Sequence, residues 1–566
     1  MKVLIISTIL LQLSIFNPVA NDSAVVQCGN ARFTVLTDRM IRMEWSENGE
    51  FEDKATLAVV NRNLPVPQFR VKDSKHKLVI KTQKVILEYV KNSRFSKDNL
   101  SVSFSMHSNG EHDKNVVWHP GDNDKGNLLG TLRTLDRCGS KQDILEKEGG
   151  PCNGLISKDG WAIIDESTRH IITQDDSDWK GLICERDTTD RQDLYILAYG
   201  HDYLDAIRDY TKIGGRVPLP PKYAFGFWIS RFWSYSDYEF IGMAERFRKE
   251  DIPADVMIID MDWHKTFCMW EGERLKDEFG LRVGWTGYTW NADLFPDPAT
   301  TLRQLHSLGF KTALNLHPAS GVQPHEDCYD EFVKDYLSRT SNYDGPAGYI
   351  YPEGGYTYVG NSSSCGTAGQ KAPVPFRLED KDFADAYFNS IIHPLEKTGV
   401  DFWWLDWQQW LQSKYMPGLD MTFLCNHMFF TDKVRQNASK GLLAERPMIY
   451  HRWGGLGSHR YQIGFSGDTK ISWNSLRMLP WFTATSSNVC YGYWGHDVGG
   501  FTRPENGLGF NGELYTRWMQ FGVFTPIFKL HSTKSTIIER NIWNYPYYSP
   551  FLKDAIHLRY SLSRYI

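Results

Sequence analysis

The chain has 566 residues, of which 41% are hydrophobic and 23% are charged, and its formal net charge is −5. This composition is that of a globular protein, and the slightly acidic balance gives no reason to expect nucleic acid as a partner. The length exceeds that of one ordinary core. We therefore expect two or more domains, with room for a barrel of roughly 250 residues or more among them.

The first 20 residues combine one lysine, an apolar run and an ending in small residues, which is typical of a cleaved secretory signal peptide. The run is short for a spanning helix and no later stretch is long enough, so we expect no membrane span. The mature chain is predicted to be in the secretory pathway, either secreted or luminal. Glycosylation sequons at Asn99, Asn361 and Asn437 fit this prediction of a glycoprotein.

Nine cysteines are spread along the chain without the spacing of a metal site. We expect no bound metal and no cofactor. Because nine is an odd number, at least one cysteine has no partner within the chain. Cys138 and Cys152 are the first pair to examine for a disulfide bond. The others are Cys28, Cys184, Cys268, Cys328, Cys365, Cys425 and Cys490.

From residue 25 to about residue 200, short runs of alternating apolar and polar residues are separated by turns, as in "KLVIKTQKVILEYV" and "NLSVSFSM". A period of two without helical stretches predicts an antiparallel β-sandwich domain. Residues 201–222 are interpreted as a helix closed by glycines and a stiff proline-rich linker, "RVPLPPKY". A second domain is predicted to begin at residue 223.

Residues 223–566 follow a different pattern, in which apolar runs alternate with helical stretches. The first helix has a capping box of Ser236 and Glu239. Eight alternations of this kind predict a (β/α)8 TIM barrel. Residues 319–399 are an insertion that would form a lid or an added subdomain. The eight apolar runs are Ala224 to Ser230, Ala254 to Trp263, Lys311 to Pro318, Val400 to Trp407, Arg446 to Trp453, Tyr461 to Thr469, Asn488 to Phe501 and Thr525 to Ser532.

Aspartates follow four of these eight runs. Asp260 and Asp262 close the second run, Asp406 closes the fourth, Asp468 follows the sixth and Asp497 follows the seventh. In a parallel barrel the carboxyl ends of the strands meet at one mouth and form the active site. Hydrolysis of a glycosidic bond needs one carboxylate as nucleophile or base and one protonated carboxyl as acid. Asp406, inside "GVDFWWLDWQQW", is the central candidate.

These residues also allow other interpretations. A carboxylate among tryptophans can be a structural group that accepts hydrogen bonds from indole N–H groups. Several aspartates can bind a metal, although the loops and histidine spacings of metal sites are missing. The glycines of "WGGLGSH" resemble a phosphate-binding loop but lack its Lys-Ser/Thr ending.

From about residue 127 to its end, the chain resembles glycoside hydrolase family 31, the α-glucosidase group of retaining enzymes. The motifs that carry the resemblance are "NLLGTLRTLD", "LISKDGWAIIDES", "PPKYAFGFWISR", "LFPDP", "WWLDWQQ", "HRWGGLGSHRYQIGFSGDT" and "GHDVGGF". The resemblance implies that Asp406 is the nucleophile and Asp468 the acid/base. It also implies that Arg452 is the family's active-site arginine, and that Asp260 and His531 bind hydroxyl groups of the sugar.

In a retaining mechanism the two carboxyl groups lie about 5 to 5.5 Å apart. We expect a raised pKa for Asp468, which has to be protonated at rest. Asp497 is a further candidate for substrate binding. Four aromatic residues are candidate walls of the sugar site, although a place in the core is an equal alternative for each of them: Trp404, Trp407, Trp453 and Phe501.

The chain departs from the family pattern after the nucleophile, where Trp407, Gln408 and Gln409 replace Met, Asn and Glu. The predicted activity is exo-acting α-glucosidase, with α-xyloside, α-galactoside, N-acetylated α-galactoside and glucosyl transfer left open. A catalytically silent glycan-binding protein is the alternative outside the enzymes, although it would need neither carboxylate. Family members continue past the barrel, so we expect C-terminal β-domains to be missing here. Nothing in the sequence indicates the oligomeric state.

Overall fold

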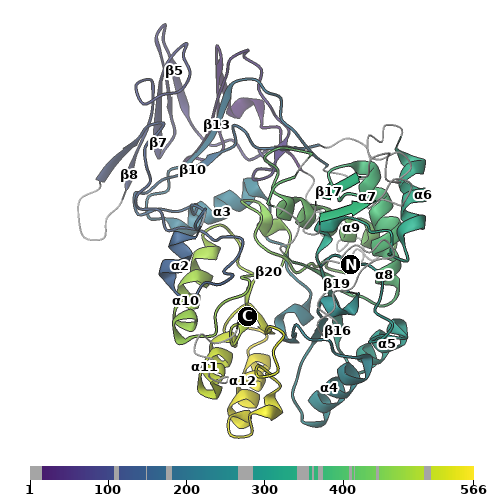
Figure 1. Cartoon of the computed structure of the whole chain (residues 1–566). Helices are drawn as coiled ribbons and strands as arrows, with labels where there is room; N and C mark the ends of the chain where they lie inside the picture. Colours follow the sequence, from purple (N-terminus) through teal and green to yellow (C-terminus); the bar gives the residue numbers. More distant parts are fainter. Residues whose placement is uncertain are drawn as a thin grey trace.

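The computed structural model describes residues 16–106, 114–147, 149–173, 182–265, 285–340, 356–359, 363–366, 374–406, 411–413, 415–441, 445–502 and 511–566. Antiparallel sheets form the N-terminal part, and a parallel sheet surrounded by helices forms the rest (Figure 1). The helix α3 (Tyr203–Gly214) lies between the two parts in this view.

Two five-stranded antiparallel sheets make up most of the N-terminal part. Their facing sides contribute to one buried cluster, with Phe33 and Met43 from the first sheet and Leu87 and Val102 from the second. This arrangement agrees with the predicted sandwich, whose limits along the chain stay a prediction. The first sheet has the order β1 (Val25–Cys28), β2 (Ala31–Val35), β3 (Met40–Ser46), β13 (Arg191–Leu197) and β10 (Ala162–Asp165); the second has β5 (Arg70–Asp73), β6 (Lys77–Lys81), β7 (Val85–Val90), β8 (Leu100–Met106) and β9 (Lys114–Trp118).

A smaller sheet and two helices complete this part. The small sheet has the order β12 (Ile183–Cys184), β11 (Ile171–Ile172) and β4 (Ala55–Thr56), and a short helix, α2 (Lys141–Glu146), follows the sandwich loops. The apolar side of α3, with Tyr210 and Ile213, packs against Tyr195 and Leu197 of β13.

Eight parallel segments close into a barrel. Seven of them are strands, in the order β19 (Phe402–Leu405), β16 (Lys311–Leu316), β15 (Val256–Ile259), β14 (Phe227–Ile229), β22 (Ile527–Leu530), β21 (Trp494–Val498) and β20 (Gly464–Phe465). The remaining segment, which is the fifth along the chain, is reduced to two parallel bridges. In these bridges Tyr450 pairs with Trp404 and His451 pairs with Gly464. These bridges join β19 to β20, so all eight predicted runs are confirmed as staves of one closed barrel.

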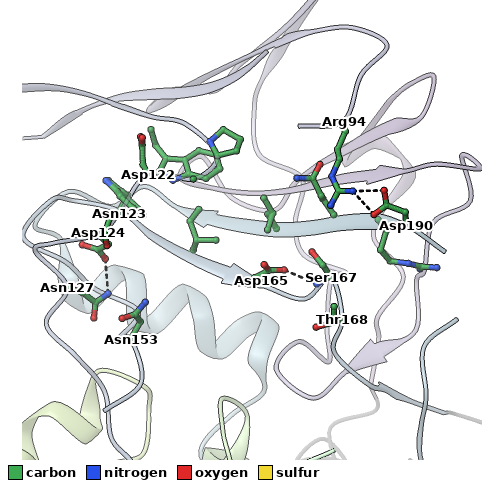
Figure 2. Close-up of a pocket in the computed structure, with 18 of the residues that line it drawn as sticks. Arg94, Asp122, Asn123, Asp124, Asn127, Asn153, Asp165, Ser167, Thr168 and Asp190 are labelled. Carbon is green, nitrogen blue, oxygen red and sulfur yellow. Dashed lines mark hydrogen bonds and ion pairs between the residues drawn. The ribbon is translucent and has the colours of Figure 1, made fainter. Parts of the chain in front are cut away.

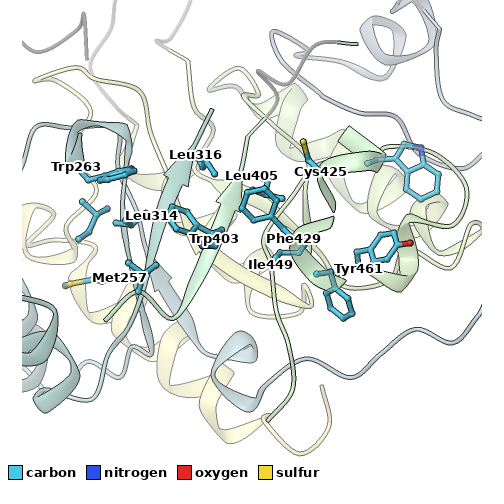
Figure 3. Packing of buried hydrophobic residues seen from close by; sticks show 14 of the residues in the cluster. Met257, Trp263, Leu314, Leu316, Trp403, Leu405, Cys425, Phe429, Ile449 and Tyr461 are labelled. Atoms are coloured by element: carbon cyan, nitrogen blue, oxygen red, sulfur yellow. The ribbon is translucent and has the colours of Figure 1, made fainter. Parts of the chain in front are cut away.

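Side chains of the barrel strands alternate between two environments, as the period of a strand requires. Val256, Ile258 and Trp404 belong to a cluster inside the barrel. Their neighbours Met257 and Leu405 belong to the larger cluster between strands and helices. Figure 3 shows this outer cluster, in which residues of the barrel segments pack with Phe429 and Cys425 of the helix Met421–Ser439 and with Tyr461. The other labelled residues of these segments are Leu314, Leu316, Trp403 and Ile449.

Helices cover the outside of the barrel. The predicted capping box at the start of the first is confirmed, because the side chains of Ser236 and Glu239 each accept a hydrogen bond from the other residue's backbone N–H. The helices are α4 (Asp237–Lys249), α5 (Pro298–Ser307), α9 (Met421–Ser439), α10 (Trp473–Ser487), α11 (Gly512–Gly522) and α12 (Ser549–Ser561).

Only a short 3-10 turn, η7 (Ser458–Arg460), lies between the fifth barrel segment and β20. This turn contacts the N-terminal part. Arg460 donates hydrogen bonds to the carbonyl groups of Leu57 and Gly214. Gly457 has a φ of +107°, and a Cβ there would lie 2.0 Å from the Leu57 carbonyl oxygen. Gly457 therefore permits the close approach of the two parts.

The insertion contains helices that pack on the barrel and a two-stranded hairpin. The stacked and edge-on rings of Phe332, Tyr336, Phe383 and Tyr387 hold its helices together. Its elements are α6 (Tyr329–Arg339), β17 (Tyr356–Val359), β18 (Ser363–Gly366), α7 (Lys381–Tyr387), the π-helical turn η6 (Phe388–Ile392) and α8 (His393–Lys397).

The pairing considered for Cys138 and Cys152 is not found, because both thiols are free. The backbone of Cys152 is hydrogen-bonded to Gly130 and Thr131, whereas the backbone carbonyl of Cys138 accepts a hydrogen bond from Lys470 N. Cys268 lies outside the described residues, and Cys365 is described only as part of the strand β18. Within the described ranges, none of the helices is both long and apolar enough to cross a membrane.

Candidate active site

Asp406 follows β19 directly and is held from three sides. Its carboxylate accepts a hydrogen bond of 2.8 Å from Arg452 Nε and one of 3.4 Å from Asn315 Nδ2. His317 Nε2 lies 3.4 Å from the same carboxylate. Burial opposes ionisation, but Arg452 and His317 outweigh it and hold the pKa of Asp406 well below its usual range. Asp406 is therefore an ionised carboxylate.

Arg452 is the buried centre of the site. It follows His451, which pairs with β20, so the barrel backbone fixes where its side chain begins. Its guanidinium lies 3.1 Å from the carboxylate of Asp136 and 3.8 Å from that of Asp468, in addition to its contact with Asp406. The three carboxylates raise the pKa of Arg452 despite burial, so the guanidinium is a permanent cation.

Asp468 lies in the loop after β20 and its side chain is 29% exposed. Its removal from water and the negative charge of Asp136 raise its pKa well above the usual range, while Arg452 acts in the opposite direction. The pKa of Asp468 is thus raised as expected, and among the charged neighbours Asp136 contributes most to the increase. The raised pKa favours the protonated form of Asp468, and solvent can reach its side chain.

The N-terminal part supplies Asp136 and Thr134, which the analysis of the sequence did not single out. The chain around Asp136 pairs with the loop after β20, because Leu135 N donates to the Ser466 carbonyl and Lys470 N donates to the Cys138 carbonyl. The Asp136 carboxylate accepts a 2.8 Å hydrogen bond from the backbone N–H of Asp468, and Thr134 Oγ1 accepts one from Arg452. A separate segment thereby fixes the position of both Asp468 and Arg452.

Asp260 and His531, the two residues expected to bind the sugar, lie together beside Asp406. Asp260 Oδ2 is 3.6 Å from His531 Nε2, and His531 Nδ1 is 2.8 Å from Ser230 Oγ. Burial raises the pKa of Asp260 to about 8 and lowers that of His531 well below its usual range. Phe501 stacks on the His531 ring at 5.1 Å, so the histidine has one apolar side and one polar side.

The other predicted residues lie in different surroundings. Trp404 is 1% exposed inside the barrel, with its ring edge-on to His531 at 5.0 Å. Trp453 packs edge-on against Tyr491. Asp497 has no exposed surface, forms a 2.8 Å ion pair with Lys529, and lies near enough to Asp468 for its charge to raise the pKa of that residue. Trp407 lies outside the described residues.

Asp262 lies in a 3-10 turn that follows β15. It forms an ion pair of 2.9 Å with Lys534 and accepts a hydrogen bond from Ser234. The described part of the chain contains no group of three or more His, Cys, Asp or Glu side chains arranged to hold a metal ion.

The arrangement combines an ionised carboxylate, a protonated carboxyl and one fixed cation. A carboxylate can attack an electrophilic carbon, and the acid can protonate the leaving oxygen. Of the neighbours that the sequence analysis missed, Asn315 and His317 stand at the end of a predicted strand, where polar residues are a recognisable signal. Asp136 stands in "NLLGTLRTLD", but nothing in the pattern of the chain connects that motif with the barrel mouth.

Residues 217–566 match the family model described as the glycosyl hydrolases family 31 TIM-barrel domain. Curated relatives include an alpha-xylosidase of Saccharolobus solfataricus, 25% identical over 391 residues, which are 66% of this chain and 46% of that protein. Alpha-glucosidase 2 of Bacillus thermoamyloliquefaciens is 26% identical over 65% of this chain and 43% of its own length. Human neutral alpha-glucosidase AB is 26% identical over 65% of this chain and 36% of its length. The match therefore spans less than half of each relative.

Solved structures show the same fold. A dextranase of family 31 from Flavobacterium johnsoniae, in complex with isomaltotriose, superposes with a TM-score of 0.64 at 19% identity, over 96% of this chain and 67% of that one. An alpha-xylosidase from Xanthomonas citri gives a TM-score of 0.62 at 16% identity, over 96% and 76% of the two chains.

Proposed function

The chain belongs to glycoside hydrolase family 31, and on this basis we propose that it is a retaining α-glycosidase that hydrolyses α-linked sugars. One observation carries the proposal. Asp406 and Asp468 lie within 4 Å of the same guanidinium, yet the pKa of the first is lowered and that of the second is raised. A pair of carboxyl groups with separated pKa values is what a nucleophile and its acid require.

In the first step, the ionised Asp406 attacks the anomeric carbon of the bound sugar while Asp468 gives its proton to the leaving oxygen. The bond between carbon and leaving oxygen breaks, and an ester between the sugar and Asp406 forms. Arg452 holds the attacking carboxylate through Nε and keeps it ionised. The partial exposure of Asp468 lets the released alcohol depart and water arrive.

In the second step, the same Asp468, now a carboxylate, removes a proton from water as the water attacks the anomeric carbon. The ester breaks, Asp406 is released as a carboxylate, and the α configuration is restored by the second inversion. Asp468 ends the cycle protonated. Its raised pKa makes it a stronger base in this step than an ordinary aspartate.

We propose α-glucoside as the preferred substrate. Asp260 and His531 form a buried polar pair beside Asp406 that can hydrogen-bond neighbouring hydroxyls, and Phe501 gives the sugar an apolar neighbour. Two of the relatives named above are glucosidases. α-Xyloside is the second candidate, because one of the named relatives is an alpha-xylosidase.

The test is release of nitrophenol from α-linked nitrophenyl glucose, xylose, galactose and N-acetylgalactosamine. We expect turnover of the glucoside, with first-formed product in the α configuration by proton NMR, and loss of turnover in Asp406→Asn. Turnover of the xyloside alone would replace the substrate but keep the mechanism. A first-formed β product, or full activity in the variant, would contradict the mechanism.

A further inference from the structure

A large hollow lies in the N-terminal part, separate from the barrel mouth (Figure 2). Its cavity volume is about 720 Å³, which is within the usual range for small-molecule sites. The floor includes Trp161 and Ile163 at β10, Leu194 of β13, and Trp118 at the end of β9. Since β10 and β9 are edge strands of the two sheets, the hollow opens where the sandwich core reaches its edge.

Polar side chains gather at two ends of this hollow. Figure 2 shows Asp122, Asn123 and Asn153 among the residues at one end and Ser167 and Thr168 among those at the other, with the strands between them. The two ends lie on loops from different parts of the chain. A ligand that spans the strands would therefore have polar groups at both ends and apolar rings below it.

Several of these polar groups are available to a ligand. Asn123, Asn153 and Thr168 are exposed, and their side chains form no hydrogen bonds with other described residues. Trp118 is 1% exposed, and its indole Nε1 has no hydrogen-bond partner among the described residues. This N–H is buried, so the donors that a ligand can reach are those of the exposed side chains.

The charges of the hollow select a neutral ligand. Its two arginines are already paired, Arg94 with Asp190 and Arg191 with Asp187. Three further aspartates line it, so a phosphorylated or sulfated ligand would meet net negative charge; they are Asp122, Asp124 and Asp165. Carboxamides and hydroxyls that both donate and accept hydrogen bonds suit the hydroxyl groups of a sugar chain.

We propose that this hollow is a second, non-catalytic binding site for neutral α-linked oligosaccharide. The choice of α-linked sugar rests on the proposed function, whereas the choice of a neutral polyhydroxylated chain rests on the hollow itself. The segment that begins at Asn127 in the hollow continues to Asp136 at the barrel mouth, so the two sites share one stretch of backbone.

A polymer held in the hollow raises the local concentration of its chain ends near the mouth. Substitutions that prevent binding in the hollow should therefore raise the KM for a long α-glucan. It should leave turnover of a nitrophenyl monosaccharide unchanged, because that substrate fills only the mouth.

The test is electrophoresis of the full chain carrying Asp406→Asn through native gels with and without soluble starch or dextran. We expect retardation in at least one polymer, and about tenfold weaker retardation after Asn123→Ala and Asn153→Ala together, since two hydrogen-bonding groups are lost. Asn115→Ala, on the exposed edge of β9, is the matched control and should change nothing.

Two results would overturn the inference: no retardation of the parent in either polymer, or equal retardation of the parent and the double variant. The failure of the proposed function is seen separately, as absence of nitrophenol release by the chain that keeps Asp406. The double variant in that active background also serves as the folding control, because its turnover of the nitrophenyl sugar should match the parent's.

Discussion

Two buried charge clusters in this molecule use the same kinds of side chain in different proportions. The sandwich cluster contains three arginines and three carboxylates, namely Arg32, Arg42, Arg186, Glu44, Asp53 and Asp193. The mouth cluster contains one arginine and three carboxylates, namely Arg452, Asp406, Asp136 and Asp468. Charges in the first are matched, and in the second they are not.

The difference appears in the proton affinities. In the sandwich cluster burial raises the pKa of Glu44, but the arginines lower those of Asp53 and Asp193. In the mouth cluster, burial and then the negative charge of Asp136 raise the pKa of Asp468 against the effect of the single cation, Arg452. We expect the balanced cluster to affect mainly stability and the unbalanced one to affect mainly the pKa of the proposed acid. Four substitutions test this distinction.

The largest effect is expected from Asp406→Asn. The amide keeps the shape of the side chain but cannot form the sugar ester, so kcat/KM for the nitrophenyl glycoside should fall by about 10⁴-fold or more. Thermal unfolding should also register the loss of the buried pair with Arg452, so activity is compared for the folded fraction of each protein. Asp401→Asn, at the other end of the same strand, is the matched control and should keep its activity. Comparable activity in Asp406→Asn would show that this carboxylate is not the nucleophile.

Asp193→Asn should have the opposite pattern. It leaves Arg42, which is 1% exposed at its side chain, without its closest carboxylate, and breaking a buried ion pair costs about 3 to 5 kcal/mol. Urea denaturation should show this loss in the free energy of unfolding, while kcat of the folded fraction is unchanged. A stable variant with reduced kcat would contradict the division between the two clusters.

Asp136→Asn should shift the pH dependence of activity. The negative charge of Asp136 raises the pKa of Asp468, so its removal lowers that pKa. Activity needs Asp468 protonated, and the alkaline limb of the kcat/KM profile should therefore move to lower pH. The amide oxygen can still accept hydrogen bonds from Asp468 N and Arg452, which keeps the geometry. An alkaline limb at the same pH as in the parent would show that Asp136 acts only through structure.

The smallest effect is expected from Asp53→Asn in the sandwich cluster. Asp53 is 42% exposed at its side chain, so its pair with Arg32 should contribute less than about 1 kcal/mol. Arg32 lowers the pKa of Asp53 against the effect of burial, so this stability is present at neutral pH and is lost as pH falls through the folded-state pKa. Parent and variant should then unfold alike in acid; a constant difference down to low pH would exclude a charge effect.

Much of the barrel could be predicted because each stave carries its own apolar run. The fifth run is apolar in the sequence although only Tyr450 and His451 pair with neighbouring strands. Burial depends on the side chains, whereas hydrogen bonding between strands depends on local backbone geometry. What the pattern could not predict is the missing helix after that segment, where η7 instead contacts the N-terminal part.

The sequence could predict only those site residues that stand next to a predicted barrel strand. Asp260, Asp406 and Asp468 were found because they end or follow barrel strands. Asp497 shares that signal but is fully buried and forms an ion pair with Lys529, and only the packing distinguishes it. Asp136 comes from the N-terminal part, so its contact with Asp468 depends on how the two parts meet.

That contact also sets a time at which the protein can first act. Asp136 and Asp468 are 332 residues apart in the chain. At a synthesis rate of about 5 to 20 residues per second, the second is added roughly 20 to 60 seconds after the first. The N-terminal sheets can fold during this interval, but the proton-holding cluster does not yet exist. The cluster around Arg452 therefore cannot form before Asp468 has been added to the chain.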